Sequence, residues 1–264
     1  MIEHSNFHSE DGWAVRETNL DLSVLANTES VFALSNGHIG LRANLEEGEP
    51  HGMPGTYLNS FYETWRLPYA ESGYGYPEAG QGLINVTNGK IIRLLVNDEP
   101  FDIRYGELRR HERVLDFRAG VLRRQAEWVS PAGQAIRLSS VRLVSLVHRS
   151  VAAILYEVEP LEAPASLVVQ SELVANEPLP AAVDGDPRTG AAVGDALRSE
   201  WFSDHEMRVT LAHRTTASEL LMAAANASDP HNGTAWMSGR QPSRMARAST
   251  TPRTNSELRK TGLV

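Results

Sequence analysis

Between residues 83 and 173 the chain alternates apolar and polar positions in short runs, with turn signals between the runs. Leu122, Ala126 and Trp128 fall on one face of an extended chain at period two, with charged or amide residues opposite. Short strands at regular spacing are typical of a sandwich or barrel, and no strand–helix unit repeats. We therefore predict an all-β fold of two stacked antiparallel sheets. The other strands predicted here cover residues 91–96, 136–143, 151–158 and 167–173.

A hairpin is predicted within residues 29–42, where two apolar runs, 31–34 and 39–41, flank Asn36-Gly37. Both turn residues accept a positive φ, so this pair between apolar runs is a strong hairpin signal. The polar side chains of His38, Arg42 and Asn44 leave the second arm together. The stretch thus predicts a tight corner that carries a small polar cluster.

Signals are weaker toward the two ends of the chain. Trp13 and Val15 predict an edge strand, whereas residues 17–26 fit a strand or a helical turn equally well. Residues 176–200 predict a loop rich in proline, glycine, aspartate and alanine. Weak strand signals return at 207–212 and 220–222, and the second segment also fits a helix because alanines follow it at 223–225.

The composition changes after residue 225. Residues 226–264 hold six arginines and lysines but only two acidic residues, so the net charge of this segment is +4. Because the whole chain has a net charge of −8, residues 1–225 carry −12. Its apolar content is too low to offset the entropy lost on ordering. We predict a β-sandwich domain over residues 1–225 and a flexible tail or truncated linker over 226–264.

Residues 48–82 are rich in glycine and proline and hold a concentration of aromatic residues. Long loops of this kind are functional or disordered, and the aromatic density argues against disorder. The rings either pack over the end of the sandwich or line a sugar-binding cleft, since aromatic faces pack well against pyranose C–H groups. They are Tyr57, Phe61, Tyr62, Trp65, Tyr69, Tyr74 and Tyr76.

One succession of motifs carries a resemblance to a known family. Asn36-Gly37-His38-Ile39-Gly40-Leu41-Arg42 is followed by an acidic patch, by Gly55-Thr56-Tyr57 and by Phe61-Tyr62-Glu63. This order resembles the opening signature of glycoside hydrolase family 65, the phosphorylases and hydrolases that act on maltose, trehalose, kojibiose and related disaccharides. His38 stands where the family has an aromatic residue, and Ala43 stands where it has a glycine. The resemblance covers about the first 225 residues.

The resemblance implies a non-catalytic N-terminal β-sandwich of the large, galactose-mutarotase-like supersandwich type, without the catalytic (α/α)6 barrel of the family. It implies that a barrel glutamate is the general acid and that inorganic phosphate is the co-substrate, so no catalytic residue or further cofactor is expected in this chain. The domain would pack on the barrel, help to wall the pocket for an α-linked glucose disaccharide and contribute to a homodimer. The residues that we predict for substrate binding are Asn36, His38, Arg42, Tyr62, Glu63 and Trp65.

Each candidate polar residue also has a purely structural interpretation. Three acids in a loop are typical of a solvated face, and Arg42 is expected to pair with Glu29 across the hairpin. Glu63 and Glu127, which lie beside aromatic residues, are expected to form a salt bridge or hydrogen bond. The loop acids are Glu46, Glu47 and Glu49, and the residues expected along a solvated basic edge are Arg109, Arg110, His111 and Arg113.

Overall composition narrows the function classes. The net charge of −8 argues against a nucleic-acid or anionic-membrane partner, and no run approaches the length of a membrane helix. Without cysteines or a secretory signal at Met1 to His4, we expect a cytoplasmic protein. His4 and His8 lack a third ligand, so no metal site is expected. The alternatives are a freestanding carbohydrate-binding module and, more weakly, a small enzyme that uses Glu46 or Glu63.

Overall fold

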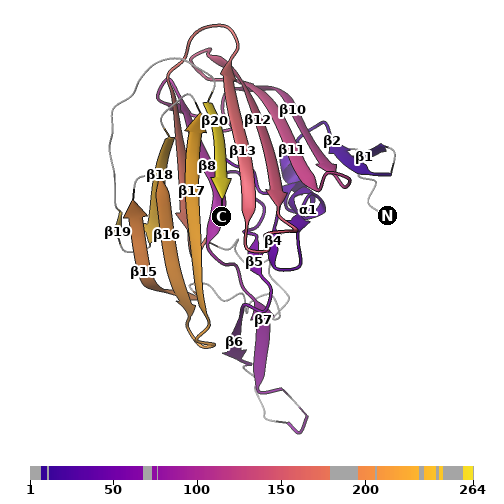
Figure 1. The fold of residues 1–264 in the computed structure, drawn as a ribbon. Coiled ribbons are helices and arrows are strands. Elements are labelled where there is room, and N and C mark those ends of the chain that lie inside the picture. Colours follow the sequence, from indigo (N-terminus) through magenta and orange to yellow (C-terminus); the bar gives the residue numbers. More distant parts are fainter. Residues whose placement is uncertain are drawn as a thin grey trace.

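The computed structural model describes residues 7–10, 12–67, 73–75, 77–178, 196–205, 207–231, 235–241, 244–245 and 258–263. It confirms the all-β prediction: the described chain is built of twenty strands, with one α-helix and one short 3-10 helix (Figure 1). Two larger sheets form the body, and the structure also describes a three-stranded and a two-stranded sheet.

The large sheet holds ten strands, and every hydrogen-bonded pair in it is antiparallel. β2 reaches β10 across about a hundred residues of sequence, and β20 lies between β13 and β17. In spatial order the strands are β1 (Phe7–Glu10), β2 (Ala14–Glu17), β10 (Glu107–Asp116), β11 (Val121–Val129), β12 (Ala135–Val144), β13 (Ala152–Pro160), β20 (Leu258–Leu263), β17 (Leu221–His231), β16 (Arg208–Thr215) and β15 (Leu197–His205).

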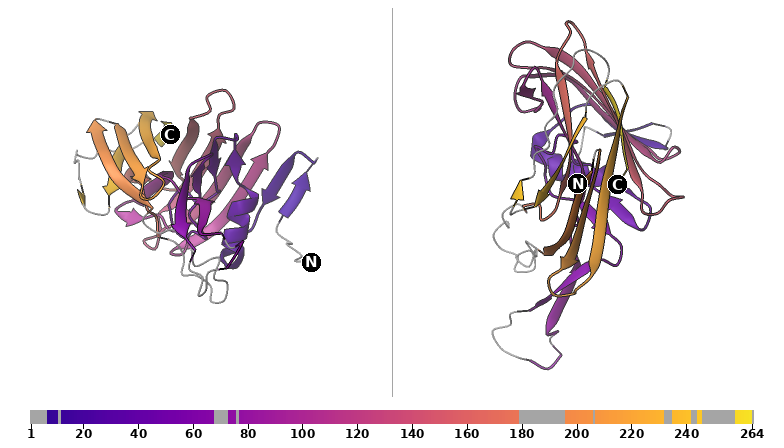
Figure 2. Two further views of the ribbon diagram at one scale, coloured as in Figure 1. Left: turned by 90° about the horizontal axis from the view of Figure 1, so that it is seen from below. Right: turned by 60° about the vertical axis from the view of Figure 1, so that its left-hand side comes forward.

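The smaller sheets contain the remaining strands. In the five-stranded sheet, the pair of β14 and β18 is parallel, which departs from the predicted purely antiparallel arrangement. β6 and β7 form a two-stranded ribbon that projects from the end of the sandwich (Figures 1 and 2). The strands are β19 (Arg244–Met245), β18 (Ala235–Gln241), β14 (Leu167–Val174), β8 (Asn88–Val96) and β9 (Glu99–Pro100); β3 (Leu34–Ser35), β4 (Ile39–Leu41) and β5 (Thr56–Leu58); and β6 (Tyr62–Arg66) with β7 (Ala79–Leu83).

The main core fills the space between the two larger sheets. Trp128 and Tyr156 from the large sheet pack in one buried cluster with Ile92 and Leu94 of β8. The Trp128 ring meets Phe101 edge to face at 5.2 Å, and its Nε1 donates to the Tyr105 carbonyl at 2.6 Å. The period-two pattern of β11 therefore has the predicted cause, since Leu122, Ala126 and Trp128 all face inward.

A short helix occupies part of the predicted hairpin. The undecided segment 17–26 becomes a 3-10 turn, η1 (Leu22–Val24), which leads into α1 (Leu25–Val31). Val31 is thus helical, and the first hairpin arm shrinks to β3. The turn at Asn36-Gly37 is confirmed, with β3 and β4 antiparallel on either side and Gly37 at φ +81°.

Strands continue past the predicted domain boundary. β17 runs through residue 225, and β18, β19 and β20 lie within 226–264, where they join both larger sheets. Main-chain pairing does not require apolar side chains, which is why the composition of this segment did not reveal it. The other residues of 226–264 lie outside the described chain, as does most of the predicted loop 176–200, so the division at residue 225 stays a prediction.

Candidate functional site

The Asn36 side chain connects its own turn to a second loop by hydrogen bonds. Its side-chain Oδ1 accepts hydrogen bonds from the backbone N–H groups of His38 and Ile39 at 2.9 and 2.8 Å. Its Nδ2 donates to the carbonyls of Ser145 and Arg149, at 2.6 and 2.9 Å, in the loop between β12 and β13. The amide of Asn36 thus makes four bonds within the chain, and it ties two separate hairpins together.

Arg42 is held against the helix α1. Its guanidinium donates to Ser30 Oγ at 2.6 Å and to the Ala26 carbonyl at 2.5 Å, and it lies 3.6 Å from the buried Glu29 carboxylate. The expected pairing with Glu29 is therefore confirmed, although Glu29 comes from α1 and not from a hairpin arm. The Arg42 stem crosses Gly55 so closely that a Cβ there would lie 2.1 Å from its Cδ.

The second group of predicted residues lies on the β6–β7 ribbon. Tyr62 is half-buried at the start of β6. The Trp65 ring lies over Gly80 and Gly82 of β7, where a Cβ would approach the ring to 2.6 and 2.9 Å. This close packing agrees with the structural interpretation of the aromatic-rich segment. Of the other rings, Phe61 is buried and Tyr74 is fully exposed, while Tyr69 and Tyr76 lie outside the described residues.

Glu63 is buried and its carboxylate holds the turn between β16 and β17. Oε2 accepts from the Ala217 N–H at 2.9 Å, and Oε1 accepts from the Ser218 N–H and hydroxyl at 2.7 and 2.6 Å. Oε1 also accepts from the Thr64 N–H at 2.8 Å. These hydrogen bonds outweigh burial and lower the pKa of Glu63. The expected hydrogen-bonding role of Glu63 is confirmed, and Glu127 pairs with Arg137 at 3.1 Å as expected.

Substitution of Glu63 by glutamine tests this role. The amide NH₂ would face an N–H donor whichever way it is oriented, so we expect the Glu63→Gln chain to lose about 1–3 kcal/mol of unfolding free energy. Urea denaturation monitored by tryptophan fluorescence gives the value. Glu107→Gln, at an exposed position, is the matched control and should change stability by less than about 0.5 kcal/mol. Equal stability of the two variants would contradict a structural role for Glu63.

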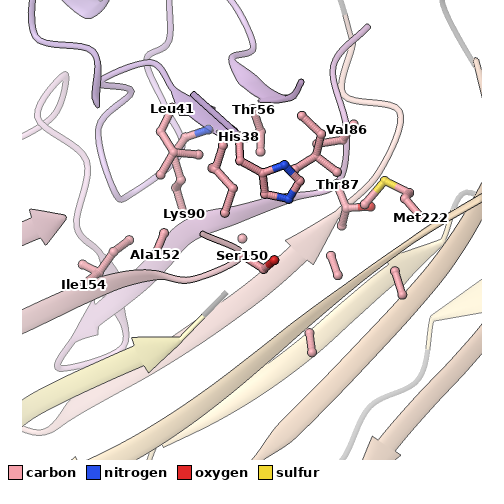
Figure 3. A pocket seen from close by; sticks show the side chains of 16 residues that line it. His38, Leu41, Thr56, Val86, Thr87, Lys90, Ser150, Ala152, Ile154 and Met222 are labelled. Atoms are coloured by element: carbon pink, nitrogen blue, oxygen red, sulfur yellow. Dashed lines mark hydrogen bonds between the residues drawn. The ribbon is translucent and has the colours of Figure 1, made fainter. Parts of the chain in front are cut away.

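His38 borders a cavity in the interior of the sandwich. The cavity has a volume of about 290 Å³ and lies under the large sheet, against β4 and β5 (Figure 3). Most of its wall is apolar, and Thr56, Thr87 and Ser150 add hydroxyl groups. Of the six predicted residues, Asn36, Arg42, Tyr62, Glu63 and Trp65 do not line it, so the structure does not gather the six around this cavity.

Lys90, on β8, also lines the cavity and was not singled out by the sequence. Its Nζ donates to the Gly55 carbonyl at 3.0 Å and to Thr56 Oγ1 at 2.6 Å. Burial lowers the pKa of Lys90 to about 7, because removal from water disfavours the charged ammonium. A lysine directly before the apolar run of β8 could have drawn attention, since a strand that leads into such a run is buried in a sandwich.

The most unexpected feature is a buried charge network centred on two glutamates. Glu46 and Glu47 are 2% and 3% exposed, so the prediction of a solvated acidic face is wrong for both of them. Arg124 Nη1 donates to Glu46 Oε2 at 2.9 Å and to Glu47 Oε2 at 2.6 Å, while its Nη2 donates to Glu47 Oε1 at 2.7 Å. Arg142 and Ser140 donate to Glu46 Oε1 at 2.8 and 2.9 Å. The two arginines hold the pKa of Glu46 at about 2 despite its burial.

Part of the predicted basic edge is buried in the interior of the sandwich, together with this charge network. Arg109 and Arg110 are exposed as expected, but His111 and Arg113 are buried. Arg124 Nε donates to His111 Nε2 at 3.2 Å, and burial next to Arg124 lowers the pKa of His111 well below its usual value. Arg113 Nε bonds Glu17 Oε2 at 2.6 Å. The expectation of a solvated edge is thus wrong for the residues on the inner face of β10.

The described residues hold no group of three or more histidine, aspartate or glutamate side chains placed to bind a metal ion. His4 lies outside them. Among the helices that the structure describes, none is long and apolar enough to cross a membrane.

Comparison with known proteins shows which family the chain belongs to. The model of the glycosyl hydrolase family 65 N-terminal domain matches residues 15–261, and the chain belongs to this family. A glycosyl hydrolase of unassigned specificity from Mycobacterium tuberculosis is 62% identical over 224 residues, which are 85% of this chain and 28% of that protein. The α,α-trehalose phosphorylase of Thermoanaerobacter brockii is 37% identical over 155 residues, 57% of this chain and 20% of that protein.

A solved structure has the same fold. A protein from the human microbiome, provisionally assigned as a kojibiose phosphorylase, superposes with a TM-score of 0.75 over 98% of this chain and 32% of its own length, at 19% sequence identity. The chain thus spans less than a third of the length of each of these three proteins.

Proposed function

We propose that this chain serves as the non-catalytic N-terminal β-sandwich of an enzyme that cleaves an α-linked glucose disaccharide, with inorganic phosphate as the co-substrate. The names of its relatives support this substrate class, since they include trehalose, kojibiose and maltose phosphorylases. The proposed partner that carries out the chemistry is the helical barrel of the same enzyme, and the proposed location is the cytoplasm.

One observation carries the non-catalytic assignment: the candidate carboxylates are all engaged inside the fold. A glycosidic general acid must hold a proton near neutral pH and must reach the leaving oxygen. Glu46 has a pKa of about 2 and is enclosed by Arg124 and Arg142. Glu47 binds Arg124 through both oxygens, and Glu63 accepts four hydrogen bonds from the chain. In this arrangement they stabilise the sandwich.

The end of the sandwich that carries the Asn36 corner is the face that we propose for docking of the barrel. Leu146 and Val147, in the loop that Asn36 holds, are 78% and 83% exposed. Adjacent exposed apolar residues on a rigidly held loop favour contact with another surface. His38 lies beside this loop, half-buried, and remains the predicted residue best placed to meet a sugar at such a boundary. A contribution of the domain to a homodimer is part of the same proposal.

An assay of the isolated chain tests the proposed function. We expect no release of glucose 1-phosphate or glucose from trehalose, kojibiose or maltose in the presence of phosphate, and no heat of binding for these sugars in calorimetry. Turnover that is lost in a Glu63→Gln or Glu46→Gln variant would overturn the proposal in favour of a small enzyme. Sugar binding without turnover would overturn it in favour of a freestanding carbohydrate-binding module.

A further inference from the structure

The cavity beside His38 has a polar side and an apolar side. The His38 ring projects into the cavity from the turn before β4 (Figure 3). Ser150, in the loop before β13, adds a hydroxyl group, and Thr87 adds another from the position before β8. The remaining wall is mainly hydrocarbon, from leucine, isoleucine, valine, methionine and alanine side chains. A ligand that matches both sides of the cavity must be amphipathic.

The polar side offers hydrogen-bonding groups that the fold does not use. Neither the His38 ring nor the Ser150 hydroxyl has a hydrogen-bond partner among the described residues. Thr87 Oγ1 lies 3.3 Å from Nδ1 of the buried His213, and burial lowers the pKa of His213, which favours its neutral ring. A neutral ring can donate from Nδ1 to Thr87, whose hydroxyl hydrogen is then free to bind a ligand. Three side chains of the cavity can therefore donate to a ligand.

The charges around the cavity favour an anion. His38 and Lys90 are among the lining residues, and no aspartate or glutamate is. The Lys90 ammonium donates to two oxygens of the chain, which leaves one of its three N–H groups. Glu29 and Glu177, the acids that act on the Lys90 charge, do not line the cavity. A carboxylate on the polar side would thus meet donors and no acidic side chain.

The volume of the cavity limits the size of the ligand. A dry cavity of about 150 Å³ holds one benzene ring, so about 290 Å³ has room for about ten to twelve non-hydrogen atoms. Ser150 is exposed and His38 is half-buried, whereas Leu41, Ala152 and Ile154 are buried. The head group would therefore stay near water, and the apolar part would fill the buried end. A sugar inside the cavity would leave most of its hydroxyl groups against hydrocarbon.

We propose that this cavity binds a small monocarboxylate whose hydrocarbon part has about seven to nine carbon atoms. The carboxylate accepts hydrogen bonds from His38, Ser150 and Thr87, and the hydrocarbon part packs against the residues of β4, β13 and β17 that line the cavity. Binding is non-covalent, and this inference does not depend on the catalytic proposal.

Calorimetric titration of the chain with sodium octanoate tests the proposal. Octanoate should bind with one molecule per chain. The uncharged analogue 1-octanol should bind about tenfold more weakly, because hydrogen bonds to a charged acceptor are the stronger ones. Octylamine, which carries the opposite charge, should give no heat of binding. No binding of octanoate, or equal affinity for octanoate and octanol, would overturn the proposal.

A variant that fills the cavity shows where octanoate binds. Ala224 is buried and lines the apolar side. In Ala224→Leu the larger side chain occupies the space of the ligand, so the affinity for octanoate should fall at least about tenfold. The melting temperature should not fall, because the added carbon atoms enter empty space. Ala119→Leu, in an exposed turn outside the cavity, is the control and should bind as the native chain does. Unchanged affinity in Ala224→Leu would overturn the proposal.

A double variant, His38→Ala with Ser150→Ala, tests the position of the carboxylate without changing the apolar side. The affinity for octanoate should fall about tenfold, while the affinity for octanol should stay within about twofold of the native value. Equal weakening of both ligands, or of neither, would contradict recognition of the carboxylate by these two side chains and would overturn the proposal in this form.

Discussion

Replacement of Arg124 by alanine is expected to lower the unfolding free energy by about 3–5 kcal/mol, because it leaves two buried carboxylates without their main partner. Arg124 binds Glu46 and Glu47 through three hydrogen bonds of 2.6–2.9 Å, and all three side chains are buried. The remaining arginine, Arg142, contacts Glu46 but makes no bond to the Glu47 carboxylate in the described structure. Urea denaturation of the purified chain measures the loss.

Arg104→Ala is the control for this variant. Arg104 also binds two acids, Asp102 and Glu49, but the pairs lie at the surface, so removal should change stability by less than about 1 kcal/mol. A similar loss in Arg104→Ala and Arg124→Ala would show that the buried network contributes no more than a surface pair, contrary to the structure.

The pH dependence gives a second, independent readout of the network. The pKa of Glu46 is about 2 in the folded chain, below its ordinary value of 4.5, so the unfolded chain binds more protons between these values. The stabilisation from Glu46 is therefore fully present above about pH 4.5 and is lost as the pH falls toward 2. In Arg124→Ala the buried Glu46 carboxylate loses a positive neighbour and binds a proton more readily, so the deficit in unfolding free energy relative to the native chain should shrink as the pH falls from 7 to 3. A constant deficit would contradict this assignment.

The second large effect is expected at Gly106. This residue has φ of +74°, and a Cβ there would lie 2.2 Å from the carbonyl oxygen of Val129 and 3.0 Å from Nε1 of Trp128. Gly106→Ala therefore combines left-handed backbone strain with the displacement of a strand edge beside the largest core side chain. We expect this substitution to lower the unfolding free energy by about 2–5 kcal/mol. Thermal denaturation followed by circular dichroism measures the change.

Gly120→Ala is matched to it, because Gly120 has a similar φ of +65° but nothing within 4 Å of the added Cβ. This control should show backbone strain alone, about 1–2 kcal/mol. If both substitutions lower the unfolding free energy equally, the close approach of Gly106 to Val129 has no energetic consequence. The packing at this edge would then be looser than the structure shows.

The parts of the fold that could be predicted from sequence are those with a local cause. β11 and β12 face a core on one side only, so their alternation is visible in the residues themselves. The Asn36-Gly37 turn is equally local, because positive φ at Gly37 depends on residue type. By contrast, α1 is seven residues long and has no side-chain hydrogen bond at its N-cap, which removes the usual signal of a helix start.

The buried charges could not be predicted, because their partners come from distant parts of the chain. Glu46 is 78 residues from Arg124 and 96 from Arg142. In isolation it is an acid in a glycine-rich loop, for which exposure is the reasonable expectation. A partial clue did exist: Arg124 falls on the same period-two face as Leu122 and Ala126, and a cation on an inward face requires a buried anion. The sequence does not show which anion fills that role.

The order of strands in the large sheet also bears on how fast the chain can fold. β2 and β10 are about a hundred residues apart in sequence, as are β13 and β20, and both pairs lie in one sheet. Each pairing requires a long loop to close before its hydrogen bonds form, and folding slows as such distant contacts come to dominate. During this delay β13 and β17 exist as unpaired edges, to which other chains can add. When this domain is produced, pairing of its own strands therefore competes with association between chains. Dilute conditions and slow synthesis favour the native sheet.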